Sequence, residues 1–267
     1  MDATNFTDGI LIQTNSDGSA PTTGTLNGAT ENIGIGKDVL KALTSADYNV
    51  VIGPDAGESI TSGGYNTLIG REAGQNISTT TNTVAIGDNA GRFNTGGNNT
   101  FVGVNAGKRG TTGATSNNTF VGVSAGANNA GGNNTVVGHQ ALIYGAGGAD
   151  NVAIGYTALQ DATGDGNIAI GSGAGLEIKS GGAKNITIGY QAGDNITSGS
   201  NNLVIGGIDT GGATSDSQIR IANGDGSVTW IAGDENGIKA HKIKVVPITG
   251  TTQLTDAQSG SYVYVTS

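Results

Sequence analysis

Aliphatic residues recur along the chain in a fixed place, directly before a glycine. Eleven times between Ile35 and Ile205 an Ile or Val directly precedes a Gly, at intervals of 16 to 19 residues. The glycines are Gly36, Gly53, Gly70, Gly87, Gly103, Gly122, Gly138, Gly155, Gly171, Gly189 and Gly206. A near-constant period of this length indicates one small unit stacked on itself, in which each copy buries its apolar face against its neighbours. We therefore expect a shaft of about eleven rungs.

Each repeat predicts one short strand that ends at the glycine. The residue before the glycine is Ile35, Ile52, Ile69, Ile86, Val102, Val121, Val137, Ile154, Ile170, Ile188 or Ile205. Two positions earlier stands Ile33, Val50, Thr67, Val84, Thr100, Thr119, Thr135, Val152, Ile168, Ile186 or Leu203. Because side chains alternate along a strand, these two columns share one face, and we expect that face to line the rung. The residue between them is also mostly apolar, and we expect it to form an outer face that needs a partner.

Polar and small residues mark the bends between strands. Asn stands four residues before the repeat glycine in ten rungs, as Asn32, Asn49, Asn66, Asn99, Asn118, Asn134, Asn151, Asn167, Asn185 and Asn202. The remaining rung has Thr83. Stacked asparagines form amide ladders along a stack of strands, so we interpret this column as structural. Ala three residues after the glycine and pairs such as Gly63-Gly64 predict two tight corners.

These patterns predict an all-β chain with four segments. We expect residues 1–31 to form an N-terminal cap or attachment segment and residues 32–206 to form a β-solenoid shaft with rungs of 16–19 residues. Residues 207–246 contain alternating runs around Asn-Gly and Asp-Gly turns, which predict hairpins in a β-meander. Residues 247–267 end on an alternating strand pattern, so we expect an incomplete C-terminal β segment.

Composition and charge exclude several classes of protein. The chain has 49 glycines, 4% aromatic and 12% charged residues, which suits many short strands and turns better than a compact core. Its net charge of −9 disfavours phosphate-rich partners, so we expect no nucleic-acid binding. No apolar stretch approaches the length of a membrane span, so we expect no membrane insertion. With no cysteine, disulfides and thiolate metal sites are excluded.

The repeats resemble those of a known group of fibrous proteins. The stretches NVAIGYTAL from Asn151, NITIGYQAG from Asn185 and NTVAIGDNAG from Asn82 are similar to the repeats of trimeric phage tail fibres and of the heads of YadA-like trimeric autotransporter adhesins. The similarity covers about two thirds of the chain. It implies a left-handed β-roll or β-helix in an intertwined or side-by-side homotrimer.

The resemblance also implies a function. Residues 1–18 lack the basic and hydrophobic regions of a secretory signal, which favours a phage fibre made in the host cytoplasm over an exported adhesin. We expect a structural tail fibre of the virion that attaches to the host surface. Its partners would be two further copies of itself, other tail or baseplate proteins, and a glycan or protein receptor. The alternative is a bacterial surface adhesin or extracellular fibre subunit.

The sequence offers few residues for catalysis or metal binding. Its two histidines are His139, which occupies a chemically mixed corner position, and His241, which lies in a predicted exposed strand. Calcium is the most plausible metal, because Asp161, Asp165, Asp225 and Asp234 lie in Gly-rich turns. Aspartates in turns usually bond their own backbone, however, and the calcium-binding nonapeptide pattern does not recur. A hydrolytic tailspike would need an acidic pair in a groove, and none stands out. We therefore expect no enzyme activity, catalytic residue, metal site or cofactor, and binding residues remain unidentified.

Overall fold

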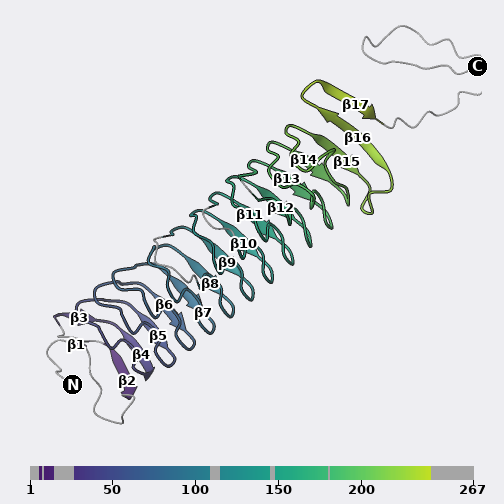
Figure 1. Ribbon diagram of the computed structural model, residues 1–267. Helices are drawn as coiled ribbons and strands as arrows, with labels where there is room; N and C mark the ends of the chain where they lie inside the picture. Colours follow the sequence, from purple (N-terminus) through teal and green to yellow (C-terminus); the bar gives the residue numbers. More distant parts are fainter. Residues whose placement is uncertain are drawn as a thin grey trace, which may run out of the picture.

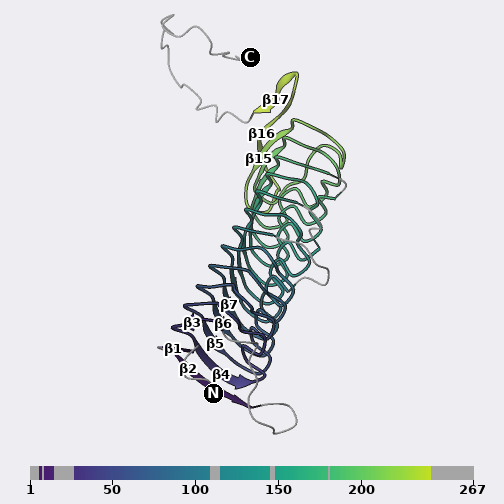
Figure 2. The same ribbon diagram turned by 90° about the vertical axis from the view of Figure 1, so that its left-hand side faces the viewer.

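The chain folds as a long β-solenoid. The computed structural model describes residues 6–7, 9–14, 27–108, 115–144, 148–179 and 181–241. Within these residues the secondary structure is all β, and one sheet of fifteen strands runs the length of the shaft, with β2 near one end and β17 at the other (Figure 1). Turning the molecule by 90° shows the rungs stacked one above another (Figure 2).

Eleven short parallel strands form the main part of the sheet, one for each repeat. They are β4 (Ile33–Lys37), β5 (Val50–Ile52), β6 (Thr67–Ile69), β7 (Val84–Ile86), β8 (Thr100–Val102), β9 (Thr119–Val121), β10 (Thr135–Val137), β11 (Val152–Ile154), β12 (Ile168–Ile170), β13 (Ile186–Ile188) and β14 (Leu203–Ile205). Neighbouring repeats pair at the same position of the motif, so that Val102 lies beside Val121 although the repeat between them is the longest. Variation in repeat length is therefore absorbed outside the strands.

Strands on both sides extend this stack. From the N-terminal segment, β2 (Ile10–Thr14) pairs in parallel with β4, while β1 (Phe6–Thr7) and β3 (Ala29–Thr30) form a separate parallel pair. At the other end β15 (Ile219–Ala222) pairs in parallel with β14, so parallel stacking continues one strand beyond the last repeat glycine. Antiparallel β16 (Thr229–Asp234) and β17 (Gly237–His241) follow. The expected segment 247–267 lies outside the described residues.

The middle residue of each strand faces the interior, which corrects the expected orientation of the strands. Val51, Leu68, Phe101 and Val136 at this position are fully buried, whereas the residues on either side of them are partly exposed. The reason lies in the asparagine column. Each Asn is buried, and a residue two positions along a strand shares its face.

A ladder of buried asparagine amides runs beside the strands. Asn49 donates from Nδ2 to Oδ1 of Asn32 over 2.9 Å, and Asn66 donates to Asn49 over 3.0 Å. The same Asn49 Nδ2 also bonds the carbonyl of Gly63 at the next corner, at 3.1 Å. The amide of Asn49 thus joins its strand to the previous rung and to the segment that leads to the next strand, and it satisfies a backbone carbonyl that the narrow interior would otherwise bury unpaired. The buried Nδ2 atoms of Asn118 and Asn151 have no hydrogen-bond partner.

The repeat glycine is required by close approach between rungs. Gly103 has a φ of 134°, and a Cβ placed on it would lie 2.5 Å from the carbonyl oxygen of Gly122 in the next rung. Gly53, Gly70 and Gly87 have nearly the same φ and the same contact with the following glycine. The motif is therefore a column of glycines stacked backbone to backbone, where a side chain would force the rungs apart.

Interior volume is balanced between strand and corner. Where the corner contributes Ile60 or Ile77, the strands carry residues of moderate size. In the middle of the shaft the strands supply Phe101 and Phe120, whose ring centroids lie 5.4 Å apart, and the corners carry the buried polar residues Asn94 and Asn129. The two phenylalanines fill space that aliphatic corner residues fill in other rungs.

Candidate functional site

The outward side chains of the strands form an uncharged apolar surface, which we call the outer stripe. It comprises the first and third residues of β5 to β14, together with Ile33 and Ile35 of β4. No residue in this set is charged. Ile35 is 39% exposed and Ile170 is 38% exposed. Contiguous exposed apolar surface of this kind marks an interaction site.

Two columns of mostly polar residues border the outer stripe. The entry column, five residues before each repeat glycine, contains Glu31, Tyr48, Tyr65, Asn82, Asn98, Asn117, Asn133, Asp150, Gly166, Lys184 and Asn201. The exit column, directly after each repeat glycine, contains Lys37, Pro54, Arg71, Asp88, Val104, Val123, His139, Tyr156, Ser172, Tyr190 and Gly207. All entry residues have left-handed φ angles between 56° and 69°. This conformation makes the sharp bend into each strand.

Both columns form contacts along the shaft. In the entry column the rings of Tyr48 and Tyr65 stack with centroids 4.8 Å apart, and Asn133 donates to Asp150 over 3.0 Å. In the exit column Arg71 pairs with Asp88 at 2.8 Å. These contacts between successive rungs hold polar side chains in straight rows on either side of the outer stripe.

The face is large enough for a stable protein interface. Strand spacing of about 4.8 Å and a rise of about 3.3 Å per residue give the eleven repeats, from entry to exit column, a face of roughly 50 by 20 Å. That is on the order of 1,000 Å², against about 800 Å² per partner in a typical stable complex. A flat face of uniform pitch is best matched by another face of the same pitch.

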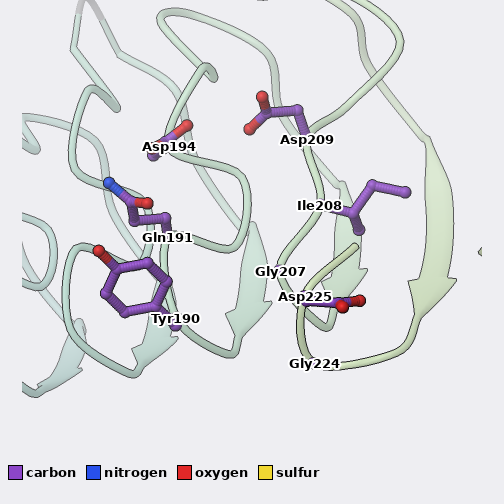
Figure 3. Close-up of a pocket in the computed structure, with 8 residues that line it drawn as sticks. All are labelled: Tyr190, Gln191, Asp194, Gly207, Ile208, Asp209, Gly224 and Asp225. Atoms are coloured by element: carbon purple, nitrogen blue, oxygen red, sulfur yellow. The ribbon is translucent and has the colours of Figure 1, made fainter. Parts of the chain in front are cut away.

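A pocket of about 510 Å³ opens beside the outer stripe near the C-terminal end of the shaft (Figure 3). Loops that follow three successive strands line it. Tyr190, Gln191 and Asp194 follow β13, the run from Gly207 to Asp209 follows β14, and Gly224 and Asp225 follow β15. We call it the acidic pocket. Its residue Tyr190 also belongs to the exit column, so the pocket and the stripe are continuous.

Carboxyl groups dominate the electrostatics of the acidic pocket. Asp194 and Asp209 reach toward one another from adjacent loops (Figure 3). Burial and a hydrogen bond with Asp209 raise the pKa of Asp194 to about 6. Hydrogen bonds from the hydroxyl and amide of Ser227 lower the pKa of Asp225, so that carboxylate stays ionised. At neutral pH the pocket is anionic and suits a cationic group.

The carboxyl pair has a different geometry from that of a glycosidase. Glycosidases hold their two carboxyl groups roughly 5 to 10 Å apart, which leaves room for the scissile bond or a water molecule. A hydrogen bond with Asp209 contributes to the raised pKa of Asp194, so these two carboxyl groups lie closer together than that. This arrangement gives no support to a hydrolytic tailspike.

The residues considered for chemistry lie in separate places. His139 is exposed and stacks on Tyr156 with centroids 5.5 Å apart, while His241 ends β17. Among the calcium candidates, Asp161 pairs with Lys179 at 3.1 Å and Asp165 accepts the amide of Ala149 at 2.8 Å.

The other two calcium candidates also have protein partners. Asp225 is bonded by Ser227, and Asp234 pairs with Lys239. Across the described ranges, no three His, Cys, Asp or Glu side chains gather as a metal site would require. In the same ranges there is no helix long and apolar enough to cross a bilayer.

Comparisons with protein families, with curated proteins and with solved structures gave no match to this chain. The outer stripe and the acidic pocket are therefore the features of the molecule that indicate its function. Sequence reasoning missed the pocket. A signal was present, because Asp194, Asp209 and Asp225 are spaced by about one repeat and so fall on successive rungs.

Proposed function

We propose that the chain is a structural fibre protein of a phage tail, whose shaft is a homotrimer that carries attachment to the host surface. The observation that supports it best is the outer stripe, an uncharged and mostly aliphatic face that follows every repeat and is partly exposed in a single chain. Packing three such faces around one axis removes them from water, at about 25 cal/mol for each Å² of apolar surface buried.

The mechanism of such a fibre is mechanical and multivalent. Ladders of glycine backbone, asparagine amides and strand pairs run along the shaft, so a pull along the axis is shared by successive rungs. Three identical chains present the same weak receptor contacts together and gain avidity through their effective concentration. The receptor, a glycan or a surface protein, would be bound by many such contacts.

Self-association can be tested by light scattering coupled to size-exclusion chromatography. We expect a particle of about three times the 26.3 kDa of one chain. Ile154→Asp and Ile170→Asp place charges on the outer stripe and should give smaller species that keep a β-sheet circular dichroism spectrum. A wild-type chain that stays monomeric at micromolar concentration would contradict the proposal.

Attachment is tested separately, on whole particles. Antibodies against the purified chain should label the tails of virus particles in electron micrographs and should reduce their adsorption to cells. Labelling of the surface of uninfected bacteria instead would favour the adhesin.

A further inference from the structure

In four of the eleven repeats the two borders of the outer stripe carry complementary side chains at the same height on the shaft. Entry and exit residues of one repeat are six positions apart in the sequence. Their pairs include Glu31 with Lys37, Tyr65 with Arg71, Asp150 with Tyr156 and Lys184 with Tyr190. These combine opposite charges, a cation with an aromatic ring, or a hydroxyl donor with a carboxylate. No repeat places like charges on its two borders.

The symmetry of an assembly decides which borders meet. When copies are related by an axis parallel to the shaft, the entry column of one copy faces the exit column of the next at the same height. When two copies are related by an axis across the shaft, entry faces entry and exit faces exit, and opposite ends meet. The entry residue of a repeat therefore meets the exit residue of the same repeat in another copy only when the copies are parallel and unshifted.

The acidic pocket also favours the parallel, unshifted arrangement. It lies on the exit side of the last repeats and includes Tyr190, whose counterpart in the entry column is Lys184. Lys184 is exposed, and the pocket offers it the carboxylates of Asp209 and Asp225 beside an aromatic face. We propose that neighbouring copies pack parallel and in register, with Lys184 of each copy seated against the acidic pocket of the next.

This inference rests on the proposed fibre, because it specifies how the copies of that fibre fit together. The outer stripe alone would not fix the register, since Ile or Val precedes the glycine in every repeat and a slide by one rung exchanges similar side chains. Such a slide moves Lys184 opposite Ser172 or Gly207 and separates Glu31 from Lys37. The border residues thus supply the specificity that the uniform stripe lacks.

Engineered cysteines provide the test, because the natural chain contains none. Single variants Lys184→Cys and Tyr190→Cys are refolded together and oxidised. We expect covalent dimers on a denaturing gel from this mixture and little from either variant alone. A mixture of Tyr65→Cys with Tyr190→Cys, one from each border but seven repeats apart, should remain monomeric on the gel.

Antiparallel packing of the copies is tested with a different mixture, Tyr48→Cys with Lys184→Cys. These positions lie in the entry column near opposite ends of the shaft and approach each other only when copies run in opposite directions. Covalent dimers from that mixture would overturn the inference. So would an oligomer seen by light scattering that gives no covalent dimer from the mixture of Lys184→Cys with Tyr190→Cys. Neither result would contradict the proposed fibre. A wild-type monomer by light scattering would overturn both.

Charge reversal gives a second measurement. Lys184→Glu should weaken association at least tenfold, because it places a carboxylate against the acidic pocket. The matched control is Lys108→Glu, a residue in the loop after β8 that belongs to neither border column, and it should leave association within about twofold of wild type. Equal weakening by both variants would contradict a specific role for Lys184.

Discussion

Asn66 donates a hydrogen bond from its side-chain amide to Asn49, but in the next rung Thr83 has no side-chain amide that could donate to Asn66. The backbone amide of Thr83 bonds Oδ1 of Asn66 at 3.0 Å, but its buried hydroxyl has no hydrogen-bond partner. The ladder of side-chain amides is therefore interrupted at this rung, as it is at Asn118 and Asn151, whose buried Nδ2 atoms have no hydrogen-bond partner. An unsatisfied buried hydroxyl costs roughly 1 to 3 kcal/mol.

Thr83→Asn should stabilise the shaft. The new amide continues the ladder and reaches the return segment, so we expect the free energy of unfolding to rise by about 1 to 2 kcal/mol. Denaturant unfolding followed by circular dichroism measures the change. The control is Thr81→Asn at an exposed neighbouring position, which should change stability by less than about 0.5 kcal/mol. A destabilised Thr83→Asn variant would mean that the ladder has no room for an amide at this rung.

Gly103→Ala should destabilise the shaft by about 3 kcal/mol, because alanine is strained at a φ of 134° and its methyl group meets the carbonyl of Gly122. Thermal unfolding of the variant measures this. Gly224→Ala is the matched change, since a Cβ there has nothing within 4 Å, and it should unfold like wild type. Similar unfolding temperatures for both variants would show that the rungs can separate locally.

Adjacent residues of β9 should respond in opposite ways. Phe120 is 1% exposed, and Phe120→Ala should cost roughly 3 to 5 kcal/mol of folding stability. Val121 points outward, so Val121→Asp should retain the β-sheet spectrum and lose self-association. Circular dichroism and light scattering on the same samples separate the two effects. Loss of the β-sheet spectrum in Val121→Asp would place its side chain in the core.

The pKa of Asp194 predicts a pH dependence of stability. The pKa is about 6 in the folded chain and near 3.8 in the unfolded chain, so between these values the folded chain binds more protons. The free energy of unfolding should therefore fall as pH rises through this window and stay lower above it. Asp209 and Glu177 supply the neighbouring charge, and Tyr190 and Asp225 share the pocket.

Asp194→Asn should remove this part of the pH dependence. Urea unfolding at several pH values is compared with and without the substitution, in an Ile170→Asp background so that association does not contribute. Asp150→Asn, at an exposed entry position, should keep the wild-type profile. Parallel profiles for wild type and Asp194→Asn would contradict the raised pKa.

The sequence predicted the all-β solenoid and the position of every repeat strand, because the periodicity of aliphatic residues and glycine is a direct record of stacking. It misassigned the faces. Both columns of each strand are apolar, so hydrophobicity could not separate inside from outside. The buried asparagines could have done so, since Asn49 and Val51 lie on the same side of one strand.

The acidic pocket could not be predicted from single residues. Asp194 and Asp209 come from different loops, and their contact depends on how loops of different rungs lie against one another. In the sequence each resembles an ordinary turn aspartate. The spacing of these aspartates by about one repeat was the available signal. It indicates that they lie close together only once the rungs are known to stack in register.

The register in which neighbouring strands pair does not change with the length of the segment that connects them. Val102 and Val121 pair in the same register as Ile52 and Ile69, although their repeats differ in length. The reach of the shaft is consequently set by how many repeats it contains, at about 4.8 Å for each, and the loops are free to vary. Recombination between two repeats could lengthen or shorten the molecule in whole rungs, and every new junction would reuse a contact that the shaft already makes.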